Sequence, residues 1–104
     1  MTSFNDREAA FESKFAHDAE MQFKAEARRN KILALWAAGL LDLAPEAVPA
    51  YVTEVIRADM EEAGAEDVFR KLAGDLGERV SEEDLRARMA QATIEAKAQL
   101  VAEA

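Results

Sequence analysis

The sequence has no cysteine, one histidine, two prolines and four glycines among its 104 residues. Without cysteine, both a disulfide framework and a thiolate metal site are excluded. The longest apolar-rich stretch, residues 32–41, is far shorter than the roughly 20 residues that span a bilayer, so we expect no membrane insertion. The first residues also lack the apolar core of a signal peptide, which indicates a cytoplasmic protein. Because helix breakers are scarce, the composition favours an all-α fold.

The net charge of −8 comes entirely from the second part of the chain. Residues 1–41 hold six acidic and six basic side chains, whereas residues 42–104 hold fifteen acidic and seven basic ones. Nucleic-acid binding depends mainly on neutralising phosphates, so this acidity argues against DNA or RNA as a partner. One basic cluster stands out, comprising Lys24, Arg28, Arg29 and Lys31. It is either a solvated helix face or a contact patch for an acidic partner or a phosphate.

Four segments have the apolar spacing of amphipathic helices, with short breaks between them. The first runs from after Phe15 to about Leu41, and Trp36 is the expected centre of the core because of the area that it buries. The second begins at Pro45 or Pro49 and ends at Ala63, before Gly64. These helices, with the two below, predict a small antiparallel four-helix bundle.

The last two helices have clear start and stop signals. The third begins at the acidic pair Glu66 and Asp67 and ends at Gly77, and the fourth runs from Glu82 to near residue 104, with Ser81 and Asp84 forming a capping box. The apolar faces predicted for the four helices are, in order, Ile32, Leu33, Trp36, Leu40 and Leu43; Val48, Tyr51, Val52, Val55, Ile56 and Met60; Val68, Phe69, Leu72, Ala73 and Leu76; and Leu85, Met89, Ala92, Ala96 and Leu100.

The first eighteen residues carry three aromatic side chains, Phe4, Phe11 and Phe15, at spacings of seven and four. In a helix these rings form one narrow stripe, too thin to face a core but suited to a groove on another protein. We therefore divide the chain into a binding arm, residues 1–18, and a bundle, residues 19–104. The arm is expected to be disordered or frayed alone and helical when bound. Alternatively, the rings extend the core face of the first helix.

No convergent set of catalytic groups is visible, so we expect neither enzymatic activity nor a cofactor or metal. There is no phosphate-binding loop, because each glycine falls near a helix end. The carboxylates follow solvated helix faces, and no Glu-x-x-His spacing supports a metal site. His17, the one histidine, is either a pH-sensitive switch in the arm or an ordinary polar residue on a helix face.

Several stretches resemble the zeta-subunit family of ATPase inhibitors from alphaproteobacterial F-type ATP synthases, once catalogued as a domain of unknown function. The resemblance spans essentially the whole chain. The matching residues of the arm and its continuation are Phe4, Asp6, Arg7, Glu8, Glu12, Lys14, Phe15, Ala16, Asp18, Glu20, Phe23, Lys24, Ala27, Arg28, Arg29 and Asn30. Further matches are the stretches at residues 36–40 and 66–73.

The resemblance implies a four-helix bundle with a mobile N-terminal arm that enters the synthase head. It would lie between catalytic and noncatalytic subunits, near the central stalk, and block rotation in the hydrolysis direction while allowing synthesis. Such a protein is cytoplasmic, peripheral to the inner membrane through the synthase, and we expect it to be monomeric alone. Phe4, Phe11 and Phe15 would be apolar anchors. The charged contact residues would be Arg7, Glu8, Glu12, Lys14 and Asp18.

Two other functions stay open. The first is a helical adaptor whose arm binds some other protein. The second is a weak nucleotide-binding regulator that uses Lys24, Arg28, Arg29 and Lys31 on phosphate.

Overall fold

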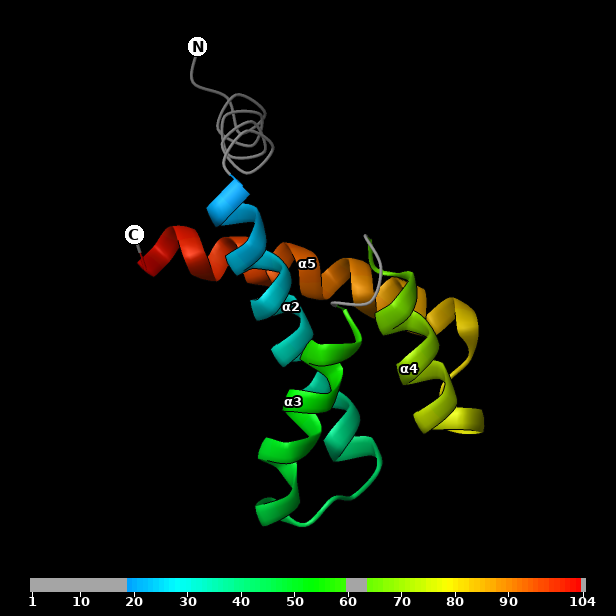
Figure 1. Cartoon of the computed structure of the whole chain (residues 1–104). Coiled ribbons are helices and arrows are strands. Elements are labelled where there is room, and N and C mark those ends of the chain that lie inside the picture. Colours follow the sequence, from blue (N-terminus) through cyan, green and yellow to red (C-terminus); the bar gives the residue numbers. More distant parts are fainter. Residues whose placement is uncertain (1–18, 60–63, 104) are drawn as a thin grey trace.

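The computed structural model describes residues 19–59 and 64–103. Within these ranges the chain forms α2 (Ala19–Leu40), α3 (Val48–Ala58), α4 (Glu66–Leu76) and α5 (Glu82–Glu103), and no strand. Two short 3-10 helices, η1 (Pro45–Ala47) and η2 (Gly77–Arg79), precede α3 and follow α4 (Figure 1). The all-α class and the four predicted helices are confirmed.

The turn after α2 is closed by backbone hydrogen bonds. The amide of Leu43 donates to the carbonyl of Ala38 at 3.1 Å, and that of Asp42 donates to Gly39 at 3.2 Å. This is the Schellman pattern, whose left-handed position usually holds glycine. Here Asp42 occupies it, with a φ of 55°, which aspartate tolerates better than most residues. The turn directs the chain back along α2.

The other helix ends follow their predicted signals in most cases. Gly77 ends α4 with a φ of 55°, and the hydroxyl oxygen of Ser81 accepts a hydrogen bond from the amide of Asp84 at 3.0 Å. One boundary was predicted wrongly, because α3 ends at Ala58 instead of Ala63. Residues 60–63, including Met60, lie outside the described residues.

The helices pack as two connected pairs. α2 and α3 run side by side in opposite directions, and α5 crosses α2 (Figure 1). α4 packs against α3 and α5. Because α2 contacts the other three described helices, it is the central element of the fold.

The core combines leucine and valine side chains from all four helices with small residues, most of them on α2. Its fully buried large side chains include Leu33, Val55, Val68, Leu72, Leu76 and Leu85. On α2 the other buried apolar residues are Ala25, Ala34, Ala37 and Ala38. These small side chains let α3 and α5 approach two adjacent sides of α2 closely.

The prediction that Trp36 is the centre of the core was wrong. Leu33 is the one buried residue of the stripe predicted for the first helix, and Leu40 is 42% exposed. Trp36 is only partly buried and packs at the edge of the core, with the guanidinium of Arg88 lying 5.8 Å from its ring centroid. A large indole does not fit where alanines set the helix spacing, so it covers the core from the side.

The faces predicted for the later helices agree better with the structure. The buried residues on α3 and α4 include Tyr51, Val55, Val68, Leu72 and Leu76, and those on α5 are Leu85, Met89, Ala92 and Ala96. Among the described residues, no helix has the length and apolar character needed to cross a membrane.

Candidate protein-binding surface

The predicted inhibitory residues precede the described part of the chain. Phe4, Arg7, Glu8, Phe11, Glu12, Lys14, Phe15 and Asp18 all lie outside the described residues, as does His17. α2 begins at Ala19, directly after this segment. The arm, and its separation from the bundle at residue 18, therefore stay predictions.

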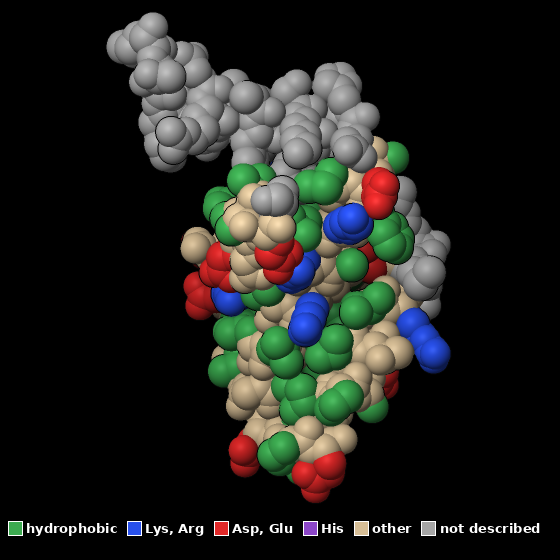
Figure 2. Space-filling model, turned by 90° about the vertical axis from the view of Figure 1, so that its left-hand side faces the viewer, with side chains coloured by type: hydrophobic (Ala, Val, Ile, Leu, Met, Phe, Trp, Pro, Cys, Tyr) green, Lys and Arg blue, Asp and Glu red, His purple; other side chains and the backbone are tan. Residues whose placement is uncertain are grey.

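A groove lies between α2, α3 and the C-terminal end of α5. It is an open depression of about 450 Å³, lined by Phe23, Lys24, Ala27, Arg28, Lys31, Ile56, Leu100 and Glu103. On this side of the molecule, Lys and Arg side chains gather among apolar ones (Figure 2). We call these eight residues the α2–α3–α5 groove. It combines an apolar floor with basic side chains.

The three basic side chains of the groove differ in their partners. Lys24 lies 3.2 Å from the carboxylate of Glu20, one turn before it, and both side chains are mostly exposed. Arg28 donates to both carboxylate oxygens of Glu103, each at 3.0 Å. Lys31 is exposed and forms no ion pair with any other described residue. The groove therefore presents unneutralised positive charge at Lys31.

The Arg28 pair connects the first turns of α2 to the last turn of α5. Arg28 also donates to the side-chain oxygen of Gln99 at 2.9 Å. Hydrogen bonding from the Arg28 guanidinium lowers the pKa of Glu103 below its usual value of 4.5, and the carboxylate in turn raises the pKa of Arg28. At neutral pH this side of the groove thus already holds an ionised carboxylate.

Arg29 does not belong to the groove, although it is next to Arg28 in the sequence. It is 8% exposed, and its Nε donates to the side-chain oxygen of Asn30 at 3.0 Å. Its guanidinium forms an ion pair with Asp59, just after α3, at 3.3 Å. The structure therefore brings Lys24, Arg28 and Lys31 together and separates Arg29 from them. Arg29 holds α2 against the end of α3.

The apolar members of the groove were not predicted as site residues. Phe23 is 66% exposed, a large exposure for an aromatic ring. It lies beside Ala27 on α2, opposite Ile56 of α3 and Leu100 of α5. The sequence contained part of this signal, since residues 24, 28 and 31 are spaced by four and three, and Phe23 lies next to them. The contributions of the other two helices depend on the packing.

The chemistry available in the described residues is that of recognition. No cluster of three or more acidic or histidine side chains in these ranges could hold a metal ion. Some exposed carboxylates are instead paired with arginines, as in Arg86 with Glu66 at 3.0 Å. An exposed aromatic ring flanked by cations suits a protein partner, because aromatic anchors and arginine are enriched at interfaces.

Comparison with known proteins places this fold in a family. The sequence model described as ATPase inhibitor subunit zeta matches residues 1–99. This chain belongs to that family. The family match supports a role as an inhibitor of ATP synthase, and thus a regulator that associates with this enzyme.

A solved structure has a similar fold. A solution NMR structure with 50% sequence identity superposes with a TM-score of 0.73, covering 81% of this chain and 99% of the other. No match was found among curated proteins. The fold is therefore shared with a solved structure over most of this chain.

Proposed function

We propose that this chain blocks ATP hydrolysis by an F-type ATP synthase by inserting residues 1–18 into the catalytic head. The arm enters between catalytic and noncatalytic subunits, beside the central stalk, and stops rotation in the hydrolysis direction while allowing synthesis. In the cell, the protein is then cytoplasmic and peripheral to the membrane through the synthase. The bundle, residues 19–104, holds the base of the arm.

One observation carries this proposal above the others. The match to the inhibitor family begins at residue 1 and so includes the arm with its three phenylalanines. In a helix, Phe4, Phe11 and Phe15 share one stripe, and a few such anchors supply most of the binding energy at an interface. Among the described residues, the core cluster is formed by side chains from α2 to α5.

Hydrolysis by a purified synthase head that lacks its own inhibitor tests the proposal. We expect the full chain to inhibit and a chain without residues 1–18 to be inactive. Phe15→Ala should raise the concentration needed for half-inhibition about thirtyfold, the loss expected for an anchor that contributes about 2 kcal/mol. Ser13→Ala is the matched control, since residue 13 lies on the opposite side of such a helix.

The melting temperature separates the arm from the alternative in which its rings pack on the core. Phe15→Ala should leave melting unchanged. A parallel loss of melting temperature and inhibition would contradict the arm proposal, and equal inhibition by the shortened chain would move the active surface onto the bundle. Failure of the full chain to inhibit would leave a helical adaptor with another partner.

A further inference from the structure

The α2–α3–α5 groove has a charge opposite to that of the chain around it. The whole protein carries a net charge of −8, yet the groove is lined by Lys24, Arg28 and Lys31, with Glu103 as its one acidic member. A positive surface attracts acidic partners, whereas the net charge of −8 makes whole copies of this chain repel one another at long range. The charge pattern therefore indicates an acidic occupant from a different molecule.

The groove already shows how it would hold a carboxylate. Glu103 meets Arg28 with two parallel hydrogen bonds, both at 3.0 Å, the bidentate geometry that makes arginine selective for carboxylates. The Glu103 side chain is 55% exposed, so the pair is open to solvent. Exposed pairs of this kind contribute little to stability. A carboxylate of a partner that is less exposed to solvent in the complex can therefore displace Glu103 from Arg28.

The apolar floor adds a requirement for the occupant. The ring of Phe23 is mostly exposed, and Ile56 and Leu100 lie across the same hollow. Covering such a ring removes apolar area from water and stabilises a complex, whereas a small inorganic anion leaves the ring uncovered. A partner that satisfies the whole groove carries an apolar side chain next to its acidic ones.

We propose that the α2–α3–α5 groove is a second docking surface, which binds an acidic segment of the synthase head that also carries a large apolar side chain. This inference rests on the proposed function and deepens it. The apolar side chain covers Phe23, Ile56 and Leu100, while carboxylates meet Lys31 and Arg28, the latter in place of Glu103. Because Phe23 lies only four residues after Ala19, this contact positions the base of the arm.

Two substitutions test the groove in the full-length chain. Lys31→Glu reverses the unpaired charge, and Phe23→Ala removes the exposed ring. We expect Lys31→Glu to raise the half-inhibiting concentration about tenfold at low salt, with a smaller effect at high salt, because the attraction is electrostatic. Phe23→Ala should raise it about fivefold, at the lower end of the range for interface anchors. Both side chains are exposed, so melting should not change.

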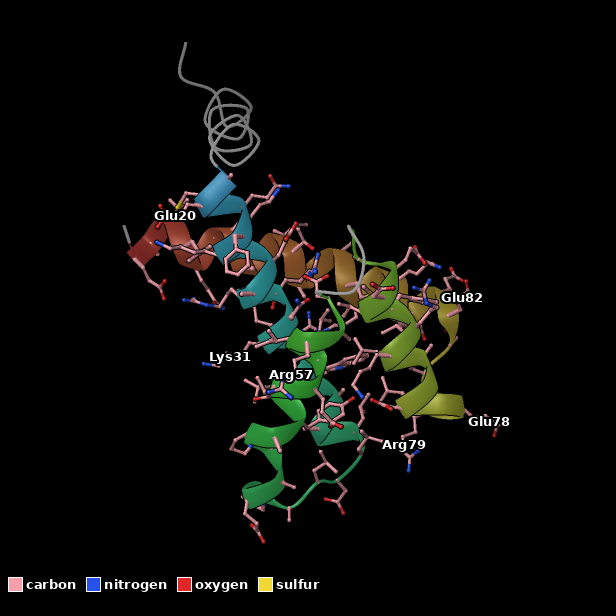
Figure 3. All side chains as sticks on the ribbon, viewed as in Figure 1. Glu20, Lys31, Arg57, Glu78, Arg79 and Glu82 are labelled. Atoms are coloured by element: carbon pink, nitrogen blue, oxygen red, sulfur yellow. The ribbon has the colours of Figure 1, made fainter. Side chains whose placement is uncertain are left out.

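A matched control lies elsewhere on the surface. Arg79 is also an exposed cation without an ion pair in the described ranges, but it belongs to η2, after α4, away from Lys31 (Figure 3). Arg79→Glu changes the net charge by the same amount and should alter inhibition less than about twofold, since distant surface charges are screened. Glu103→Gln should have the opposite effect on inhibition. It frees Arg28 and should lower the half-inhibiting concentration.

The outcomes separate the two proposals. If the unchanged chain inhibits and both Lys31→Glu and Phe23→Ala inhibit equally well, the docking proposal for the groove fails. The proposal for the arm is then unaffected. No inhibition by the unchanged chain would overturn the proposed function itself. If sedimentation instead showed a dimer that Lys31→Glu dissociates, the groove would belong to a second copy. If inorganic phosphate or ATP bound the groove with full affinity in Phe23→Ala, it would be an anion site, and the protein-docking proposal would fail.

Discussion

The two halves of α2 are held in place by different forces. From Leu33 onward the helix buries Leu33, Ala34, Ala37 and Ala38 in the core. Before that point its buried side contains the polar residues Arg29 and Asn30 beside Ala25. The ion pair of Arg29 with Asp59, at 3.3 Å, fastens this first half to the end of α3.

The difference explains how one helix both builds a core and presents a binding surface. The half held by apolar packing buries Leu33 completely, although Leu35 and Leu40 stay exposed at its surface. The half fastened by the ion pair buries no large apolar side chain and leaves Phe23 and Lys31 exposed to a partner. An ion pair also fixes orientation, because the partner of Arg29 must be at one position. The first half therefore offers a defined surface with little core of its own.

The largest expected effect on stability comes from weakening the apolar packing of the second half of α2. Leu33 is fully buried, so Leu33→Ala should lower the free energy of unfolding by about 3 kcal/mol through lost burial and a cavity. Denaturant unfolding measures this loss. Below the melting transition, inhibition of the synthase head should be unchanged, since Leu33 does not line the groove. A loss below about 1 kcal/mol would show that the core can collapse around the site.

A smaller and more local effect on stability should follow from removing the ion pair that holds the first half of α2. Asp59→Asn leaves the buried guanidinium of Arg29 without a carboxylate and should cost about 2 kcal/mol, less than for a fully buried pair because both side chains keep some exposure. Amide hydrogen exchange should speed up in residues 25–31 more than in residues 33–40. Glu54→Gln, an exposed change on α3, is the control. If amide exchange became faster by the same factor along the whole of α2, the two halves would not be held by different forces.

The smallest effect concerns the pH dependence of the Arg28–Glu103 pair. Because hydrogen bonding lowers the pKa of folded Glu103 below 4.5, the pair stabilises the fold fully above that value. This stabilisation is lost as the pH falls through the lower, folded pKa. An NMR titration of the Glu103 carboxyl should show the depressed pKa, and Arg28→Gln should restore the usual one. Arg79→Gln should not. An unchanged pKa in Arg28→Gln would exclude the guanidinium as its cause.

Local signals in the sequence predicted most of the helix boundaries. Proline at 45, glycine at 77 and the Ser81 cap act through the backbone of their own segment, so they could be interpreted without knowledge of the packing. The end of α3 was misplaced because apolar spacing continues to Met60, past Asp59. The ion pair of Asp59 with Arg29 is a tertiary contact that periodicity does not contain.

The candidate surface was predictable only in part. Lys24, Arg28 and Lys31 were recognised from their clustering, but clustering alone grouped them with Arg29, which is buried. The spacing of four from Ala25 through Arg29 to Leu33 was the available sign that Arg29 lies on the core side. Trp36 was misplaced because size favours burial only where the helix spacing leaves room. The arm, recognised from its aromatic spacing, is tested by experiment alone.

The contact of Arg28 with Glu103 places the end of α5 beside the first half of α2 (Figure 1). Because the chain has no cysteine of its own, one introduced thiol, as in the exposed position of Ala102→Cys, is a unique attachment point. A dye placed there stands at the edge of the groove and leaves residues 1–18 unaltered. A change in the fluorescence of this dye on mixing with the synthase would measure the binding of the inhibitor in real time.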